Sequence, residues 1–327
     1  MKRACVTGGA GFIGSNLAER LSAQGVEVVI LDDFSTGRRE FAHAAQAAGA
    51  QLLEGDVLDQ ATLAAAFHGC DWVFHMQANA DVRRGLEHPT RDLRQNTLAT
   101  SSVLEAMRAQ GVARIVFAST GSVYGEPDVF PTPEDAPFPV QTSLYAASKL
   151  AGEGLVAAYA AGFGFAGVIC RFVSVLGERY THGHVHDFYR ALKRDPARLR
   201  VLGDGRQEKS YMHVQDCLDG MLLAAARHHD EPGAHVYNLG TDETLLVDES
   251  VALIAAHMGL SPAIEHAGGR RGWTGDSPLI RLDTARIRRL GWAPRLTIAQ
   301  ALERTLAWLD ANEYAWRGAL AQEACAS

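Results

Sequence analysis

The stretch "VTGGAGFIGSN", residues 6–16, decides the fold of this chain. It follows a short apolar run at 3–7 and opens an amphipathic segment at 12–24, so it predicts a turn between a first strand and a first helix. Glycines in such a turn allow tight geometry and close approach of the backbone to a pyrophosphate, which the helix dipole favours. The glycines with this G-x-x-G-x-x-G spacing are Gly8, Gly11 and Gly14.

An aspartate supports the same interpretation. The apolar run "VEVVIL" (26–31) predicts a second strand, and Asp32 follows it directly. A carboxylate at this point accepts hydrogen bonds from an adenosine ribose and repels a 2′-phosphate. Arg38 and Arg39 could instead hold a 2′-phosphate, but Asp32 makes NAD the predicted cofactor rather than NADP.

Strands and helices alternate over the first half of the chain. This rhythm predicts an α/β fold with a doubly wound parallel Rossmann sheet in residues 1–173. A smaller, less regular α/β lobe is expected in residues 174–327, with 235–240 returning to the main sheet as a strand. Further strands are expected at 50–56, 70–75, 113–120 and 164–172, and helices at 38–48, 60–67, 90–110, 143–161, 185–194, 247–258 and 297–310.

Composition excludes several classes of protein. The 327 residues carry a net charge of −7, whereas proteins that bind duplex nucleic acid are usually basic. No apolar run is long enough to span a bilayer, and glycines interrupt the N-terminal region where a signal peptide needs an unbroken apolar stretch. The cysteines have no metal-ligand spacing, so we expect reduced thiols in a cytoplasmic protein. They are Cys5, Cys70, Cys170, Cys217 and Cys325.

A tyrosine and a lysine are the first candidates for catalysis. Tyr145 and Lys149 are four residues apart on an expected helix and therefore share a face. A nearby lysine, together with a positive nicotinamide ring, would stabilise the phenolate and lower its pKa from about 10. Thr120 ends an expected strand 25 residues before Tyr145 and adds a hydroxyl.

Taken together, motifs along nearly the whole chain resemble those of extended short-chain dehydrogenase/reductases, in the NAD-dependent epimerase/dehydratase family. They are "TGGAGFIG" (7–14), "GDVLD" (55–59), "HMQANADV" (75–82), "QNTLAT" (95–100), "ASTGSVYG" (118–125), "YAASK" (145–149), "RFVSVLGER" (171–179), "GDGRQEKSYMHVQD" (203–216) and "GDSPLIRLDTARIRRLGW" (275–292).

The resemblance implies roles for individual residues. Tyr145 would be the acid/base, Lys149 would bond the nicotinamide ribose, and Thr120 would bond the reacting sugar oxygen. The remaining cofactor positions would be Gly8, Gly11, Phe12, Ile13, Gly14, Asp32, Asp56, Val57 and Asn96. The substrate positions would be Thr120, Ser122, Ser174, His184, Val185, Lys209, Arg271 and Asp276. Two of these depart from the family pattern: Ser174 replaces an asparagine, and Arg271 is the arginine nearest to position 273, which is tryptophan here.

The resemblance also implies a reaction. Dehydratases and decarboxylases of the family carry carboxylates just after the position of Thr120, where this chain has Gly121 and Ser122. We therefore expect NAD-dependent epimerisation at C4 of a UDP-sugar of the UDP-glucose/UDP-galactose type, through a 4-keto intermediate. The alternatives are UDP-glucuronic acid 4-epimerisation, for which Arg83 or Arg84 could bind the carboxylate, and a dehydratase, decarboxylase or reductase. A catalytically silent dinucleotide-binding protein would not need all three candidate catalytic residues.

Histidines at alternate positions in "THGHVHDF" (181–188) raise the question of a metal. Alternate side chains converge only on a strand, whereas the residues from Val185 onward have a helical pattern. The chemistry of the family needs no metal, so none is expected. The resemblance implies a homodimer formed through helices at about 97–110 and 143–161.

Overall fold

The computed structural model describes residues 1–79, 84–138, 140–273, 276–277 and 279–317. Its centre is a seven-stranded sheet in the order β11-β6-β5-β4-β1-β2-β3, in which every neighbouring pair is parallel. The doubly wound parallel sheet expected from the sequence is therefore confirmed. The strands are β1 (Arg3–Thr7), β2 (Glu27–Asp32), β3 (Gln51–Glu54), β4 (Trp72–His75), β5 (Arg114–Thr120), β6 (Ala166–Phe172) and β11 (Gly233–Leu239).

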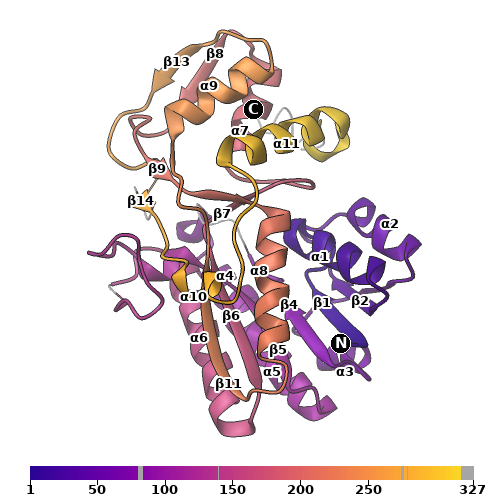
Figure 1. The fold of residues 1–327 in the computed structure, drawn as a ribbon. Helices are drawn as coiled ribbons and strands as arrows, with labels where there is room; N and C mark the ends of the chain where they lie inside the picture. The colour runs from indigo at the N-terminus through magenta and orange to yellow at the C-terminus, as the bar shows by residue number, and fades with distance from the viewer. Residues whose placement is uncertain (80–83, 139, 274–275, 278, 318–327) are drawn as a thin grey trace.

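Helices cover both faces of this sheet (Figure 1). On β1, Ala4 and Val6 point to one hydrophobic cluster and Cys5 points to the other, so the strand is buried on both sides. One cluster contains the apolar faces of α1 (Phe12–Ala23), α2 (Arg39–Ala47) and α8 (Val214–Arg227). The other contains those of α3 (Gln60–Phe67), α5 (Ala99–Gln110) and α6 (Leu144–Phe163).

The order of the strands positions a binding crevice. The chain runs outward from β1 to β2 and β3, and then returns to β4 on the other side of β1. Ligands of open parallel sheets bind outside the carboxyl ends of the strands at such a switch point. The loops after β1, β2, β4 and β5 meet at this edge.

The smaller lobe lies above the carboxyl ends of the strands in Figure 1. Its helices and its short strand pairs come from the second half of the chain. They are α7 (His184–Arg194), α9 (Val247–His257) and α11 (Ile298–Ala311), with β7 (Ser174–Leu176) on β10 (Tyr211–His213), β8 (Arg198–Val201) on β13 (Ala263–His266), and β9 (Glu208–Lys209) between β12 (Leu245–Leu246) and β14 (Leu279–Ile280). A short helix, α10 (Ala285–Arg288), follows.

Two elements of the second half pack with the main sheet. β11 pairs with β6 along its whole length. Helix α8, which the sequence pattern did not reveal, buries Cys217, Leu218 and Met221 against the sheet. β10 leads directly into α8, with His213 as the N-cap of the helix. The hydrophobic pattern therefore changes from the period of a strand to that of a helix with no turn residues to mark the boundary.

The expected helix at 90–110 is divided into three parts. A turn of α-helix, α4 (Pro89–Asp92), leads into a π-helical segment (Leu93–Leu98), and α5 follows. Asn96 lies in the π-helical segment, and such segments often occur at functional sites. Among the described residues, no helix is long and apolar enough to cross a membrane.

Candidate active site

The glycine loop connects β1 to α1 at the carboxyl edge of the sheet. Gly8 has a φ of +65°, and its N–H donates to the carbonyl oxygen of Leu31 at 2.8 Å. A Cβ at Gly8 would lie 2.7 Å from the backbone of Gln77, and one at Gly14 would overlap the carbonyl of Gly8. Both positions therefore require glycine.

The first turn of α1 offers an anion site. Gly11 is the N-cap, and no side chain caps the helix, so the N–H groups of Phe12, Ile13 and Gly14 remain available as donors in the described chain. A pyrophosphate at these N–H groups, with Ile13 and Gly14 among its donors, stays a prediction. The Phe12 ring instead packs edge-on against Tyr180, with 5.5 Å between ring centroids.

Asp32 ends β2 beside this loop. Its carboxylate accepts hydrogen bonds from the N–H groups of Ala10 and Phe34, both at 2.9 Å. Burial raises the pKa of the Asp32 carboxyl, and the two backbone donors oppose that shift. Across the β2–β3 pair, the N–H of Gly55 donates to the carbonyl oxygen of Asp32 at 3.1 Å.

The residues expected near the adenine follow Gly55. Asp56 is exposed and accepts a bond from the N–H of Leu58 at 2.9 Å, whereas Val57 is buried. Both follow β3 at the same edge as Asp32, and their place beside an adenine stays a prediction.

The two arginines that could hold a 2′-phosphate have other partners. Arg38 donates to the carbonyl oxygens of Tyr314 and Ala315, both at 3.1 Å. Arg39 pairs with Glu54 and lies over the ring of Phe34. A dinucleotide with a free 2′-hydroxyl fits this site, and NAD meets that requirement.

Three candidate catalytic residues lie together at the ends of β5 and α6. Thr120 ends β5, and its hydroxyl oxygen accepts from the N–H of Ser122 at 3.1 Å and donates to the Ser122 hydroxyl at 3.2 Å. Tyr145 lies in the first turn of α6, where its side chain is hydrogen-bonded to that of Thr120. Lys149 follows one helical turn later and is buried.

The lowering of the Tyr145 pKa by Lys149 together with a nicotinamide ring stays a prediction, and the protein by itself shifts this pKa upward. Burial raises the pKa of Tyr145 to about 12, and the hydrogen bond with Thr120 opposes this only in part. The Lys149 ammonium donates to the carbonyl oxygen of Ala118 at 2.8 Å and lies 4.9 Å from the ring centroid of Phe117. Burial also lowers the pKa of Lys149 to about 8, although Glu153 opposes the shift.

Asn96 is part of a hydrogen-bonded group that supports α6. Its amide donates to the Ser148 hydroxyl at 2.8 Å, and its side-chain oxygen accepts from the N–H of Asn79 at 2.8 Å. Its carbonyl oxygen accepts from Thr100 at 2.6 Å, and Thr100 contacts the buried imidazole of His75 at 3.2 Å. Sequence reasoning missed Ser148 and His75, although Ser148 is three residues after Tyr145 on the same helix.

Below Lys149 lies a buried ion pair that the sequence also did not reveal. Glu153, one turn further along α6, accepts from Arg171 of β6 at 2.6 Å and from the hydroxyl of Ser119. Arg171 also donates to the Tyr124 hydroxyl at 2.6 Å. The pair joins α6 to two strands directly beneath the candidate catalytic residues.

The expected diphosphate ligands converge in the smaller lobe. Lys209 on β9 donates to the carboxylate of Asp276 at 2.6 Å and to the carbonyl oxygen of Ser277. Arg271 donates to the carbonyl oxygen of Asp276 at 3.4 Å and pairs with Glu126. Lys209, Arg271 and Asp276 therefore lie together, and both cations are held by protein carboxylates.

The segment with alternate histidines is helical from His184 onward, as expected. His184 bonds the Ser250 hydroxyl at 2.8 Å and lies 3.1 Å from the Tyr211 hydroxyl. Burial lowers the pKa of His184 to about 4. Val185 is fully buried, so only its backbone could contact a ligand, and Ser174 is exposed at the start of β7.

Two sequence expectations fall outside the described part of the chain. Arg83, expected as a possible ligand of a uronate, lies among residues 80–83, outside the described residues. Arg84 begins a short 3-10 turn, and its side chain is likewise outside the description.

Comparisons with known proteins show what the whole chain is similar to. The model of the NAD dependent epimerase/dehydratase family matches residues 4–240. The UDP-glucose 4-epimerase of Corynebacterium glutamicum is 34% identical over 89% of this chain and 91% of its own. A crystal structure of a UDP-galactose 4-epimerase has a TM-score of 0.86 at 36% identity, covering 95% of this chain and 99% of its own.

A third similar protein, MoeE5, was solved with UDP-glucuronic acid and NAD. Its TM-score is 0.84 at 30% identity, and the match covers 95% of this chain and 99% of that one. The same protein was also solved with UDP-glucose and NAD. The switch-point crevice, the glycine loop and the match over most of the sequence lead to one assignment: this chain belongs to the NAD dependent epimerase/dehydratase family.

Proposed function

We propose that this protein interconverts UDP-glucose and UDP-galactose by NAD-dependent epimerisation at C4. The observation that carries the proposal is the grouping of Thr120, Tyr145 and Lys149 beside the glycine loop, with no carboxylate at the two positions after Thr120. Relatives named as UDP-glucose and UDP-galactose 4-epimerases share about a third of the sequence over nearly the whole chain.

The chain's own residues would handle the proton and orient the sugar. NAD, when bound, supplies hydride acceptance from C4 and hydride return. The Tyr145 oxygen would take the proton of the C4 hydroxyl and give it back, while Thr120 holds the same sugar oxygen by a hydrogen bond. Lys149, buried beneath, would bond the ribose and add positive charge near the phenol.

The nucleotide must stay bound while the 4-keto sugar rotates to present its opposite face to NAD. Lys209 and Arg271 would bind the diphosphate, and Asp276 would border the nucleotide. In the described chain, both cations are paired with carboxylates, so binding requires an exchange of partners. His184 and the backbone of Val185 would contact the sugar nucleotide from α7, Ser122 from the 3-10 turn after β5, and Ser174 from the start of β7.

Dehydration and decarboxylation are disfavoured by the space around Gly121. A Cβ there would lie 3.2 Å from Ile280 and from the carbonyl oxygen of Phe172. An acidic side chain would therefore need its neighbours to move. The following residue, Ser122, is hydrogen-bonded to Thr120 and carries no carboxylate.

UDP-glucuronic acid remains the second candidate substrate, because MoeE5 was solved with it. An arginine at position 83 or 84 would form a charge-assisted hydrogen bond with the carboxylate, worth about 1.5–3 kcal/mol. The neutral hexose is favoured, since arginines in polar loops are usually solvated.

We also propose a cytoplasmic location, because the four described cysteines are free and buried.

The test is incubation of purified protein with UDP-galactose, UDP-glucose and UDP-glucuronate, followed by NMR of the products. UDP-, dTDP- and GDP-linked sugars should be compared under the same conditions. Appearance of the C4 epimer of UDP-glucose without added NADH supports the proposal. A 4-keto-6-deoxy product, a pentose product or a strong preference for UDP-glucuronate would contradict it. In that last case, Arg84→Ala should abolish the preference if this arginine binds the carboxylate.

A further inference from the structure

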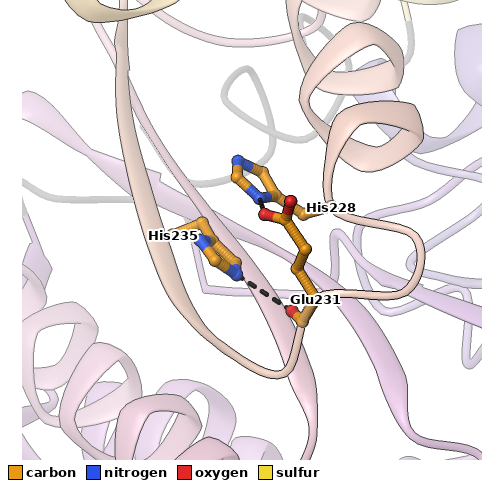
Figure 2. Close-up of side chains that lie close together, drawn as sticks. All are labelled: His228, Glu231 and His235. Atoms are coloured by element: carbon orange, nitrogen blue, oxygen red, sulfur yellow. Dashed lines mark hydrogen bonds and ion pairs between the residues drawn. The ribbon is translucent and has the colours of Figure 1, made fainter.

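Three side chains able to bind a metal converge at the turn between α8 and β11. They are His228, Glu231 and His235, and their ligand atoms all lie within 4.8 Å of one another. Figure 2 shows the two imidazoles side by side, with the Glu231 side chain extending toward His228. Two imidazoles and a carboxylate are a donor set that suits Zn²⁺ and related divalent cations.

Hydrogen bonds determine which nitrogen of each ring carries the hydrogen. The Nε2 atom of His228 lies 2.7 Å from the Tyr237 hydroxyl, which leaves Nδ1 facing Glu231 Oε2 at 2.7 Å. The Nε2 atom of His235 donates to the carbonyl oxygen of Glu231 at 3.0 Å, so the lone pair of this ring lies on Nδ1. Imidazoles that bind metals usually have their second nitrogen fixed in this way.

The three side chains are close enough to affect one another's charge. The two rings are stacked, with 3.6 Å between centroids and 11° between planes, so simultaneous protonation would be repulsive. Burial lowers the pKa of His228; Glu231 opposes this shift, and His235 adds to it. Hydrogen bonds from Arg227 and His228 lower the pKa of the Glu231 carboxyl.

The position of the cluster separates it from catalysis. β11 begins at Gly233 and runs parallel to β6, so this turn lies at the amino edge of the sheet. Thr120 and the glycine loop lie at the opposite, carboxyl edge. A cation here would join the end of α8 to the start of the edge strand and would not reach the reacting sugar.

We propose that His228, Glu231 and His235 form a structural site for a divalent transition metal such as Zn²⁺, with water completing the coordination. Ligand distances of about 2.0–2.2 Å require the donor atoms to lie about 3.4 Å apart. Two stacked imidazoles cannot both direct a lone pair at one cation, so binding requires the Glu231 side chain to rotate and one imidazole to turn out of the stack. The metal would replace the hydrogen on His228 Nδ1 that now faces Glu231, and the Tyr237 hydroxyl can pair with either tautomer of His228.

The test is calorimetric titration of untagged, EDTA-treated protein with ZnCl₂. One saturable site per chain is expected, and Zn²⁺ should raise the melting temperature. His235→Ala and Glu231→Gln should each weaken binding by at least about tenfold, because each removes one of three protein ligands. His43→Ala, at an exposed position on α2, is the control and should bind Zn²⁺ as the wild type does.

Binding of Co²⁺ should give the visible absorption of a four-coordinate site in the wild type but not in His235→Ala. Turnover of UDP-galactose should stay within about twofold of wild type in both cluster variants, so failure of this site is distinguishable from failure of the epimerase assignment. The proposal is overturned if no saturable binding occurs up to about 100 µM Zn²⁺. It is equally overturned if both variants, folded by circular dichroism, bind Zn²⁺ as tightly as the wild type.

Discussion

The phenol of Tyr145 is a weaker acid in this site than in water, because burial raises its pKa to about 12. The neutral form therefore dominates near pH 7, and proton removal depends on positive charge brought close to it. Replacing Tyr145 with Phe removes the proton carrier but keeps the ring. We expect turnover to fall by at least about a hundredfold, measured with UDP-galactose in a coupled assay.

Tyr159→Phe is the matched control, since Tyr159 lies on the same helix but its hydroxyl bonds Glu105 on α5. This variant should keep turnover close to that of the wild type. Near-normal turnover in a folded Tyr145→Phe protein would show that another group carries the proton.

Cofactor choice is the second property that one residue controls. Asp32→Ala removes the carboxylate expected to bond the adenosine ribose, so NAD should bind more weakly and NADP should be discriminated less. Calorimetry on cofactor-stripped protein with each dinucleotide measures both effects. If wild-type protein binds NADP as tightly as NAD, Asp32 does not bind the adenosine ribose in the way proposed.

The buried imidazole of His75 should make the free energy of unfolding depend on pH. Burial, followed by the nearby charge of Lys149, lowers its pKa to about 3, whereas the unfolded value is about 6.5. The unfolded chain therefore binds this proton first, so the stabilisation is complete above pH 6.5 and is lost as the pH falls toward 3. Between pH 7 and 5 the loss should be about 2 kcal/mol.

Urea unfolding of wild type and His75→Gln at several pH values tests this difference. The variant should be less stable at pH 7 but should lose less stability on acidification. Equal slopes for the two proteins would mean that the imidazole is not held neutral.

At the scale of elements, the strands were predictable because both faces of a parallel sheet are buried, which makes each strand a continuous apolar run. The π-helical segment could not be predicted, because the hydrogen bonds of the Asn96 side chain to Ser148 and Asn79 depend on tertiary contacts. Tyr145 and Lys149 were candidates from their spacing, and the structure places Thr120 beside Tyr145. The bond from the Lys149 ammonium to the carbonyl oxygen of Ala118 could not be predicted, because no local sequence pattern encodes it.

The Glu153–Arg171 pair joins α6 to β6 and gives a prediction for these elements. Both side chains are buried, so Glu153→Ala leaves an unpaired guanidinium inside the protein. We expect a loss of about 3–5 kcal/mol in the free energy of unfolding, measured with urea. Glu27→Ala, which breaks an exposed pair with Arg3, should cost less than about 1 kcal/mol. A similar small loss for Glu153→Ala would mean that water reaches Arg171.

The whole molecule distributes its functions over different surfaces. Catalysis is expected at the carboxyl edge of the sheet, and the histidine turn lies at the amino edge. The outer face of α6 has no role in either site, and it presents a stripe of small side chains to solvent. The stripe consists of Ala147, Ala151, Gly154 and Ala158, all exposed. A Cβ at Gly154 would meet nothing within 4 Å, so the surface there is open.

Small residues allow two helices to approach closely, so we predict a homodimer through α5 and α6. The residues recur at i, i+4, i+7 and i+11, which keeps them on one face of the helix. Light scattering at micromolar concentration should give about twice the 35.2 kDa mass of the chain. Ala151→Glu places a charge in the middle of the stripe and should yield the single-chain mass, because an unpaired charge is costly to bury.

Ala44→Glu makes the same change at an exposed position on α2 and should remain dimeric. Thermal unfolding should become less dependent on protein concentration in Ala151→Glu, since assembly no longer contributes to its stability. A single-chain mass for the wild type would rule out the dimer. A dimeric Ala151→Glu protein would instead place the interface on another surface and leave the small residues of α6 facing water.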